Sequence, residues 1–344
     1  MKRTSAAVAA CVLGFGLFAG CKHAAPLAAA SASPPLAKVS VRDGVADRDF
    51  LYCGEWQTDR PGEHMYLVRG GKVVWSYEVS DKEEYGDCTM MSNGHVLFVR
   101  KGRGASEVIP DLKSGYGGEL VWDYPGGGPG TEVHSVQPVG LDKVWVMQNG
   151  TPPRFMLFDK KNPMPLRTLT FEAGPKVHGQ FRHVRVTAEG TFVVAHLNLG
   201  KVVEYAADGS TVLFSTPAPS AWAAVKLKNG NYLISGNQYK YVREVNRAGS
   251  VVWELTQKDV DFPIFTIQEA MRRANGNTIV NSWVSTHDMP REDWSKTVQV
   301  FEVTPDKRVV WKLSAWRDPN LGPGSSTQPL DEPGLPERPG DQMR

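Results

Sequence analysis

The side chains best suited to chemistry lie close together in one short stretch of the sequence, Lys176 to Arg185. It contains His178, Gln180, Arg182 and His183. An arginine can hold a carboxylate, sulfate or phosphate in bidentate fashion, and a histidine can move a proton near neutral pH. Together these residues predict a site for an anionic ligand.

Two further histidines, His134 and His196, are expected nearby and leave three interpretations open. In the first, His134, Arg182 and His183 are catalytic and perform acid–base or nucleophilic work on the ligand. In the second, the imidazoles bind a metal ion, because neutral imidazole is a common metal ligand. In the third, the side chains satisfy one another and line a water-filled channel. The sequence defines no set of metal ligands.

The elements that would position these residues are short strands that recur along the chain. The clearest unit is Trp222 to Leu255, in which Asn229-Gly230 supplies a tight hairpin turn between the first two of four strands. Equivalent turns lie at Asn93-Gly94, Leu141-Asp142, Glu189-Gly190 and Asn275-Gly276, and the fourth strands carry Trp75, Trp122, Arg167, Phe214, Trp253 and Trp311. These repeats predict an all-β, six-bladed β-propeller as a single domain over residues 47–335.

One blade lacks its innermost strand, because six fourth strands are accompanied by only five first hairpins. Phe50 to Tyr52 has the pattern of a second strand, and Ser326 to Leu330 has that of a first strand. Pairing them would close the ring and remove an exposed sheet edge. We therefore expect N-/C-terminal strand closure of one blade, with residues 336–344 as a tail. The alternative is that the whole segment from Pro323 onward is a disordered tail.

Candidates for ligand binding are the polar and aromatic residues at the starts of the innermost strands and in the loops between second and third strands. In a propeller both sets surround the axis on one face and would line a shared funnel. They are Glu55, Gln57, Asp87, Gln148, Asn149, His178, Gln180, His196, Asn198, Trp222, Asn237, Gln268, Glu269, Asn281 and Trp283. A longer connection, residues 284–297, is expected to cover the funnel as a lid anchored by Trp294.

The units GKVVWSYEV (residues 71–79), GELVWDYPG (118–126) and GSVVWELTQ (249–257) resemble the PQQ-like repeats of the quinoprotein-like and arylsulfotransferase-like β-propellers. The resemblance covers nearly the whole body and is specific for the fold more than for activity. Arylsulfotransferase-like members use axial histidines and arginine. Pyrroloquinoline quinone is not expected, because the dehydrogenases that bind it have more blades and a pair of adjacent cysteines, which this chain lacks. The cofactor is otherwise unknown.

Residues 1–20 have the pattern of a signal peptide, since Lys2 and Arg3 precede a short apolar run. Leu17 to Cys21 resembles the lipobox of bacterial lipoproteins, which implies that this cysteine carries a lipid. Residues 21–46, rich in Ala, Ser and Pro, are then a flexible tether. Lys22 after the cysteine implies the outer membrane of the bacterial cell envelope, with the body facing the periplasm or the surface. The alternative is an ordinary cleaved secretory signal.

Net charge limits the kinds of partner the chain can bind, and cysteine content limits the disulfides it can form. A formal net charge of +2 offers no basic face for nucleic acid, and the chain is expected to be a monomer held to the membrane by its lipid. Only Cys53 and Cys88 remain after processing. In an oxidising compartment they can pair, and the alternative is two buried free thiols.

These observations predict an exported, lipid-anchored propeller that binds a small anionic or carbohydrate-like ligand, or an envelope partner, at its axial face. The first alternative is an arylsulfotransferase-like enzyme or a metal-assisted lyase, and the second is a scaffold in an envelope assembly. The sequence contains no phosphate-binding glycine loop, CxxC pair, nucleophile elbow or EF-hand loop. Because none of these motifs is present, the sequence does not identify the ligand or any reaction.

Overall fold

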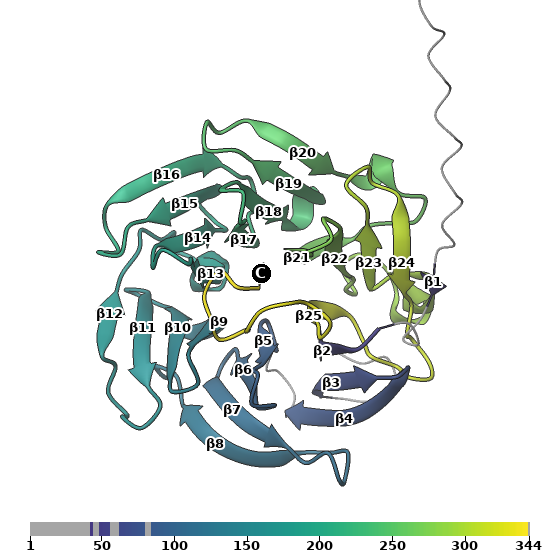
Figure 1. Ribbon diagram of the computed structural model, residues 1–344, viewed down its shortest axis with the longest axis horizontal. Coiled ribbons are helices and arrows are strands. Elements are labelled where there is room, and N and C mark those ends of the chain that lie inside the picture. The colour runs from purple at the N-terminus through teal and green to yellow at the C-terminus, as the bar shows by residue number, and fades with distance from the viewer. Residues whose placement is uncertain (1–41, 44–47, 56–61, 80–83, 343–344) are drawn as a thin grey trace, which may run out of the picture. The chain divides into compact units, whose positions relative to one another are not determined.

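The computed structural model describes residues 42–43, 48–55, 62–79 and 84–342. Their strands form six sheets arranged in a ring around a central axis (Figure 1). The predicted class, an all-β six-bladed β-propeller, is confirmed. Within the described part of the chain, no helix has the length and apolar character needed to cross a membrane.

Each blade has four antiparallel strands, which follow one another from the axis outward. Blade 1 contains β25 (Gly324–Pro329), β2 (Phe50–Gly54), β3 (Glu63–Arg69) and β4 (Lys72–Val79), and blade 2 contains β5 (Cys88–Met90), β6 (Val96–Arg100), β7 (Gly104–Pro110) and β8 (Gly118–Tyr124). Blade 3 contains β9 (Glu132–Val139), β10 (Lys143–Asn149), β11 (Arg154–Asp159) and β12 (Arg167–Leu169), and blade 4 contains β13 (Phe181–Val186), β14 (Phe192–His196), β15 (Lys201–Tyr205) and β16 (Val212–Pro217).

Blade 5 contains β17 (Ala223–Lys226), β18 (Tyr232–Gly236), β19 (Tyr241–Val245) and β20 (Val251–Leu255), and blade 6 contains β21 (Thr266–Arg272), β22 (Thr278–Trp283), β23 (Val300–Val303) and β24 (Val309–Leu313). Short 3-10 helices lie in the connections: η1 (Val177–Gly179), η2 (Asn237–Tyr239), η3 (Gln257–Asp259) and η4 (Arg291–Lys296).

The predicted Asn-Gly turns join the first and second strands of their blades. In the turn at Asn229-Gly230, the glycine has φ +85° and the Asn229 side chain accepts a hydrogen bond from the Asn231 backbone N–H at 3.0 Å. Asparagine suits this position because its side chain can close a turn locally, and glycine suits the next because it adopts positive φ without strain.

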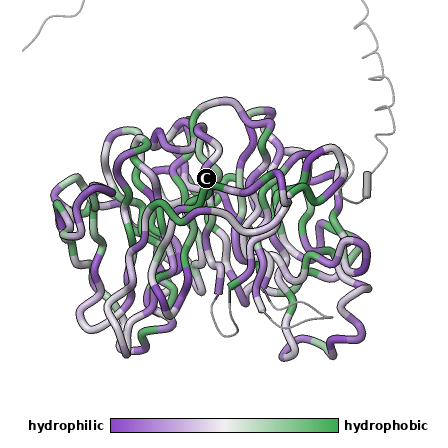
Figure 2. The backbone as a smooth tube through the Cα atoms, turned by 90° about the horizontal axis from the view of Figure 1, so that it is seen from below, coloured by the Kyte–Doolittle hydropathy of each residue, from purple (hydrophilic) through white to green (hydrophobic). Residues whose placement is uncertain are grey.

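Among the described residues, six of the seven clusters of buried hydrophobic side chains each lie between two neighbouring blades, and the seventh joins Val284, Trp294 and Trp316. Trp75 belongs to the cluster between blades 1 and 2, and Trp311 packs against Phe50 between blades 6 and 1. Both indoles are fully buried, as expected for large side chains that fill the wedge between splayed blades. Figure 2 shows hydrophobic stretches inside the body and many hydrophilic loops at its edges.

Strand β25 closes the ring, as predicted. It pairs antiparallel with β2, with Phe50 opposite Pro329 and Tyr52 opposite Thr327. Every residue of β25 is buried. One strand was not predicted: β1 (Arg42–Asp43), in the segment assigned to the tether, pairs in parallel with β24 as a fifth strand of blade 6.

The segment after β25 crosses the centre of the ring (Figure 1) and contacts the first hairpin turns of several blades. Arg273 in blade 6 donates hydrogen bonds to the carboxylates of Asp331 and Glu332 at 2.7 and 2.5 Å. Glu337 accepts one from the Ser92 backbone N–H in blade 2 at 3.1 Å, and its carbonyl accepts one from Gly140 in blade 3 at 2.8 Å. Residues 331–337 are therefore attached to the hairpin-turn face of the propeller.

The structure joins Cys53 and Cys88 in a disulfide, with Cα atoms 6.5 Å apart. Cys53 lies in β2 of blade 1, and Cys88 begins β5 of blade 2. Of the two alternatives for these buried cysteines, the structure shows the disulfide, which connects the closing blade to its neighbour.

Candidate functional site

A cavity of about 800 Å³ opens around the axis on the face opposite the first hairpin turns. Of the residues predicted to bind a ligand, eight line it: Glu55, His178, Arg182, Asn198, Trp222, Asn237, Gln268 and Trp283. Gln57 and the predicted lipidation site Cys21 lie outside the described residues. The volume is in the range of pockets for small organic ligands.

The innermost strands carry β-bulges where they reach this cavity. The pairing of β13 with β14 shifts between Phe181 and Val184, and the pairing of β21 with β22 shifts between Ile267 and Ala270. A bulge inserts an extra residue and redirects side chains, which is why bulges recur beside binding sites. Beside the bulge in β13, Arg182 lines the cavity while His183, the next residue, does not.

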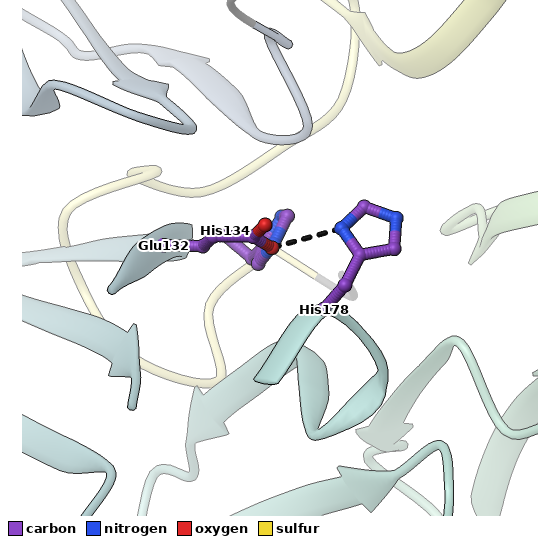
Figure 3. A group of neighbouring side chains, drawn as sticks. All are labelled: Glu132, His134 and His178. Carbon is purple, nitrogen blue, oxygen red and sulfur yellow. Dashed lines mark hydrogen bonds and ion pairs between the residues drawn. The ribbon is translucent and has the colours of Figure 1, made fainter. Parts of the chain in front are cut away.

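Figure 3 shows Glu132, His134 and His178. Together with Arg182, which the figure does not draw, they form a hydrogen-bonded ring. Glu132 Oε2 lies 2.7 Å from His134 Nε2 and 2.8 Å from His178 Nδ1. Arg182 closes the ring, because Nη1 lies 2.8 Å from His134 Nδ1 and Nη2 lies 2.6 Å from His178 Nε2. Nη1 also lies 3.0 Å from His134 Nε2. With His134 neutral, its Nε2 donates to the Glu132 carboxylate and its Nδ1 accepts from the guanidinium.

The electrostatics of this ring favour neutral imidazole. Burial and the positive charge of Arg182 lower the pKa of His134 to about 3. Burial opposes ionisation of Glu132, but its hydrogen bonds to His134 and His178 outweigh burial and lower its pKa. His134 is therefore an acceptor for Arg182 at neutral pH, whereas the side chain of His178 is 55% exposed and faces solvent.

A second network lies further along the axis, where residues of blades 2, 4 and 6 meet. Arg185 donates to both oxygens of Asp87 at 2.8 and 3.0 Å and to His183 Nδ1 at 2.8 Å, and it lies 3.5 Å from Glu269. All four side chains are buried. Burial opposes ionisation of Asp87, but the Arg185 charge outweighs it and lowers the pKa of the carboxyl. Asp87, His183 and Glu269, predicted to face the funnel, do not line the cavity but connect blades 2, 4 and 6 across the axis.

Both networks contain residue types that bind metal ions. In each, three potential ligand atoms lie within 4.8 Å of one another: those of Glu132, His134 and His178, and those of Asp87, His183 and Glu269. However, each set already surrounds a guanidinium, Arg182 in the first and Arg185 in the second. A cationic side chain at hydrogen-bond distance from the ligand atoms competes with a metal ion for them, so neither set suits a metal in this arrangement.

The remaining predicted residues make contacts inside the protein and do not line the cavity. They are Gln148, bonded to Tyr124; Asn149, bonded to the carbonyls of Val177 and Phe181; Gln180, bonded to Gly150; His196, bonded to Tyr205; and Asn281, bonded to Thr327. Asn149 and Gln180 position η1, and thereby His178. Burial lowers the pKa of His196 to about 4, which keeps it neutral.

Several lining residues were not among the predicted ligands: Glu84, Lys176, Ser220, Tyr239, Lys240, Thr266, Ser285, His287 and Asp288. His287 and Asp288 come from the predicted lid, whose Trp294 is fully buried against Trp316. Ser220 and Lys240 both have φ +56°, and with Lys307 they are the non-glycine residues with positive φ in the described ranges. Such conformations tend to gather at ligand sites, but sequence gives no signal of them.

Two carboxyl groups in the cavity have opposite charge preferences. Burial and the nearby negative charge of Glu84 raise the pKa of Glu55 to about 8. Burial also opposes ionisation of Glu84, but Arg182, His134 and Lys101 together outweigh it and lower the Glu84 pKa. Near pH 7, Glu55 is therefore largely a neutral acid and Glu84 is a carboxylate.

The fold and the axial cavity define the chain as a six-bladed β-propeller with a polar, aromatic pocket. It is similar to a protein of unknown function from Bacteroides caccae (TM-score 0.70, 20% identity, covering 83% of this chain and 99% of that chain). It also resembles a protein from Lactobacillus plantarum (0.55, 11%, 83% and 99%) and a streptogramin B lyase (0.50, 11%, 78% and 80%). At such identities the likenesses establish the fold alone.

No protein-family model matches the sequence, and no curated protein matches it either.

Proposed function

We propose that the protein binds a small anionic or sugar-like ligand in the axial cavity. The observation that carries this proposal is a set of buried polar atoms at the cavity that lack a partner within the described residues: Arg182 Nε, Trp222 Nε1, Asn237 Nδ2 and Gln268 Oε1. A buried polar group without a partner costs roughly 1–3 kcal/mol, which a ligand that bonds to it can recover.

The balance of these atoms indicates the ligand chemistry. Three are donors and one is an acceptor, which favours a ligand rich in oxygen acceptors. Lys176 and Lys240 add positive charge at the cavity, and Trp222 and Trp283 offer apolar ring faces. A sugar presents hydroxyls and an apolar C–H face, and an acidic group on it could pair with Arg182. A sugar carrying a carboxylate or sulfate therefore satisfies both the donors and the rings.

Calorimetric titration with acidic oligosaccharides and with their neutral counterparts tests this proposal. Arg182→Ala should lower affinity for the acidic ligands strongly, because a charge-assisted hydrogen bond contributes roughly 1.5–3 kcal/mol. Arg167→Ala is the matched control, since Arg167 lies on the outer strand β12 and bonds to the Ala207 carbonyl. Equal affinity in all three proteins, or no binding by the unmodified protein, would contradict the proposal.

We also propose that the protein is located in the cell envelope. The lipobox-like end of the signal segment supports lipid attachment at Cys21, and two or more acyl chains would anchor the body stably. Cys21→Ser should release the protein from the membrane fraction without changing its melting temperature. Continued membrane association of the variant would count against lipidation.

The enzyme alternative is supported by the position of Arg182 and His178 in the cavity and by the repeats that resemble arylsulfotransferase-like and quinoprotein-like propellers. Of the three residues proposed as catalytic, Arg182 can reach a ligand, His134 acts through Arg182, and His183 lies in the second network. A metal-assisted lyase is less well supported, because guanidinium groups occupy the candidate metal sites. An envelope scaffold would use the outer rim, where the described structure suggests no particular partner.

A further inference from the structure

Three carboxyl groups line the cavity and have no role in the binding proposal: Asp288, which accepts hydrogen bonds from Ser285, and the pair Glu55 and Glu84. We propose that Glu55 and Glu84 form an acid–carboxylate pair that hydrolyses a glycosidic bond in the bound ligand, with Glu55 as the proton donor. This inference rests on the proposed function, because it requires a sugar-containing ligand in the same cavity.

The fold brings the two residues to the same wall of the cavity. Glu55 directly follows β2 in blade 1, and Glu84 lies in the link that leads from blade 1 to blade 2. The backbone N–H of Glu55 donates to the Pro323 carbonyl at 2.8 Å, which attaches this residue to the segment before β25. The positive charge of Arg182 lowers the pKa of each carboxyl group.

Glu84 is held in its charged form by cations. Lys101 Nζ donates to Oε1 at 2.7 Å, and Arg182 Nη1 lies 3.7 Å from Oε2. Oε1 is thus engaged, whereas among the described residues Oε2 has the longer contact with Arg182 and can approach a ligand. A fixed carboxylate of this kind can stabilise positive charge that develops on a sugar ring carbon.

Glu55 is kept neutral by its surroundings. It is 3% exposed, and the charged or titratable groups that face it are Glu84, Glu63, Arg182 and Tyr52. Hydrogen bonds from Ser325 and Trp283 favour its ionised form, but burial and the charge of Glu84 outweigh them. Two carboxyl groups whose environments separate their proton affinities are the usual acid and base of a glycosidase.

The side chains around the pair support a ligand at this place independently of the carboxyl groups. Asn237, Gln268 and Arg182 are 5%, 2% and 4% exposed, and each has a polar atom at the cavity without a partner in the described protein. Amides both donate to and accept from sugar hydroxyls, and Arg182 could pair with an acidic substituent.

The reaction balances with water as the only co-reactant. The Glu55 carboxyl proton passes to the glycosidic oxygen as the bond from that oxygen to the ring carbon breaks, and the bond's electron pair stays on the departing oxygen. The Glu84 carboxylate stabilises the positive ring carbon. A water molecule then supplies a hydroxyl to this carbon and a proton to the Glu55 carboxylate, which restores both side chains.

The first experiment incubates the unmodified protein with polygalacturonate, alginate, hyaluronate and chondroitin sulfate. We expect new reducing ends from at least one polymer, no ultraviolet absorbance of an unsaturated uronate, and no loss of activity in a chelator. The rate should fall above about pH 8, where Glu55 ionises. Unsaturated products, a requirement for metal, or no cleavage of any of the four polymers would overturn the inference.

The second experiment uses Glu55→Gln and Glu84→Gln, with Glu189→Gln as control because Glu189 lies at a hairpin turn and pairs with Lys226. We expect each of the first two to lower kcat on the cleaved polymer by roughly 10²–10⁴-fold with little change in KM. On a 2,4-dinitrophenyl glycoside of the same sugar, Glu55→Gln should recover most activity, because this leaving group needs no proton, whereas Glu84→Gln should not.

Binding and hydrolysis can fail separately. If the unmodified protein and both glutamine variants bind acidic oligosaccharides but none cleaves a glycosidic bond, the binding proposal stands and the acid–carboxylate pair is excluded. Equal losses for Glu55→Gln on the polymer and on the activated glycoside would also exclude Glu55 as the proton donor. If the unmodified protein neither binds nor cleaves, both proposals are wrong.

Discussion

The guanidinium carbon of Arg182 lies 4.6 Å from the centroid of the Trp222 ring. The same guanidinium bonds to His134 and His178, so its edge and its face are both held by neighbouring side chains. Arginine in this setting loses little additional freedom when it binds an anion, because its orientation is already defined.

Replacing Trp222 with Leu should therefore weaken binding of an acidic sugar. Loss of the cation–π contact and the ring face should cost roughly 1–2 kcal/mol, which corresponds to a decrease in affinity of about 5- to 30-fold. Trp222→Phe keeps a ring but removes the indole N–H. Its affinity should therefore lie between those of the unmodified protein and the Leu variant. Titration calorimetry measures all three, and unchanged affinity in the Leu variant would count against this role.

Deletion of residues 324–344 should destabilise the whole propeller. It removes β25 and leaves the buried strand β2 without its inner partner, which exposes a sheet edge. Deletion of residues 331–344 keeps β25 and removes only the contacts of the following segment, so a smaller decrease in melting temperature is expected. Calorimetric melting of the three proteins measures the difference. Equal melting of the shorter deletion and the longer one would show that β25 contributes little.

Glu63→Gln should stabilise the protein at alkaline pH. Burial, together with the charges of Glu55 and Glu84, raises the Glu63 pKa to about 10. The folded state then holds a proton that the unfolded state releases near pH 4.5, so this group costs stability as pH rises from about 4.5 towards 10. Glutamine has no proton to lose and keeps an oxygen for the Tyr85 N–H, which lies 3.2 Å from Glu63 Oε2.

The readout for this prediction is the melting temperature of both proteins between pH 5 and pH 9. The advantage of the glutamine variant should grow with pH, and for a domain of this size each kcal/mol corresponds to roughly 2–4 °C. A constant difference across this range would mean that Glu63 ionises like an exposed carboxyl group.

Replacing both Cys53 and Cys88 with Ala should lower the free energy of unfolding. The disulfide links residues 35 positions apart, and closing a loop of that length stabilises a protein by roughly 3–4 kcal/mol in the chain-entropy treatment. Unfolding by denaturant, with and without a reductant, measures the effect in the unmodified protein. The double variant should be insensitive to the reductant, and a reductant effect that persists in it would point to another cause.

Much of the fold was predictable because the same hairpin pattern recurs in successive repeats of the sequence. The pair Asn229-Gly230 and its equivalents locate the first hairpins, and a missing first hairpin before Phe50 indicates that another segment must supply the strand. Strand β1 was not predictable, because Arg42–Asp43 is too short to carry a pattern. The attachment of Glu337 to blades 2 and 3 likewise depends on tertiary contacts alone.

The sequence predicted that a polar site lies at the axis, but it did not predict which individual side chains line the cavity. Gln268 and Glu269 are adjacent at a bulge in β21, yet Gln268 lines the cavity and Glu269 lies 3.5 Å from Arg185. A repeat alignment identifies both positions but not which of the two side chains reaches the cavity. Glu84 was missed for a related reason, since it lies in a link between blades where no strand pattern defines its direction.

The use of β25 in blade 1 also has a consequence for biosynthesis. The ribosome makes β2 before the strands of blades 2 to 6, but it makes the inner neighbour of β2, Gly324–Pro329, after all of them. Until then the apolar strand Phe50–Gly54, buried in the finished ring, keeps an open hydrogen-bonding edge that invites pairing with other chains. Blades 2 to 5 can form in order as they emerge, whereas blade 1 has to remain unfinished, so a chain that stops before β25 has an incomplete first blade rather than an incomplete last one.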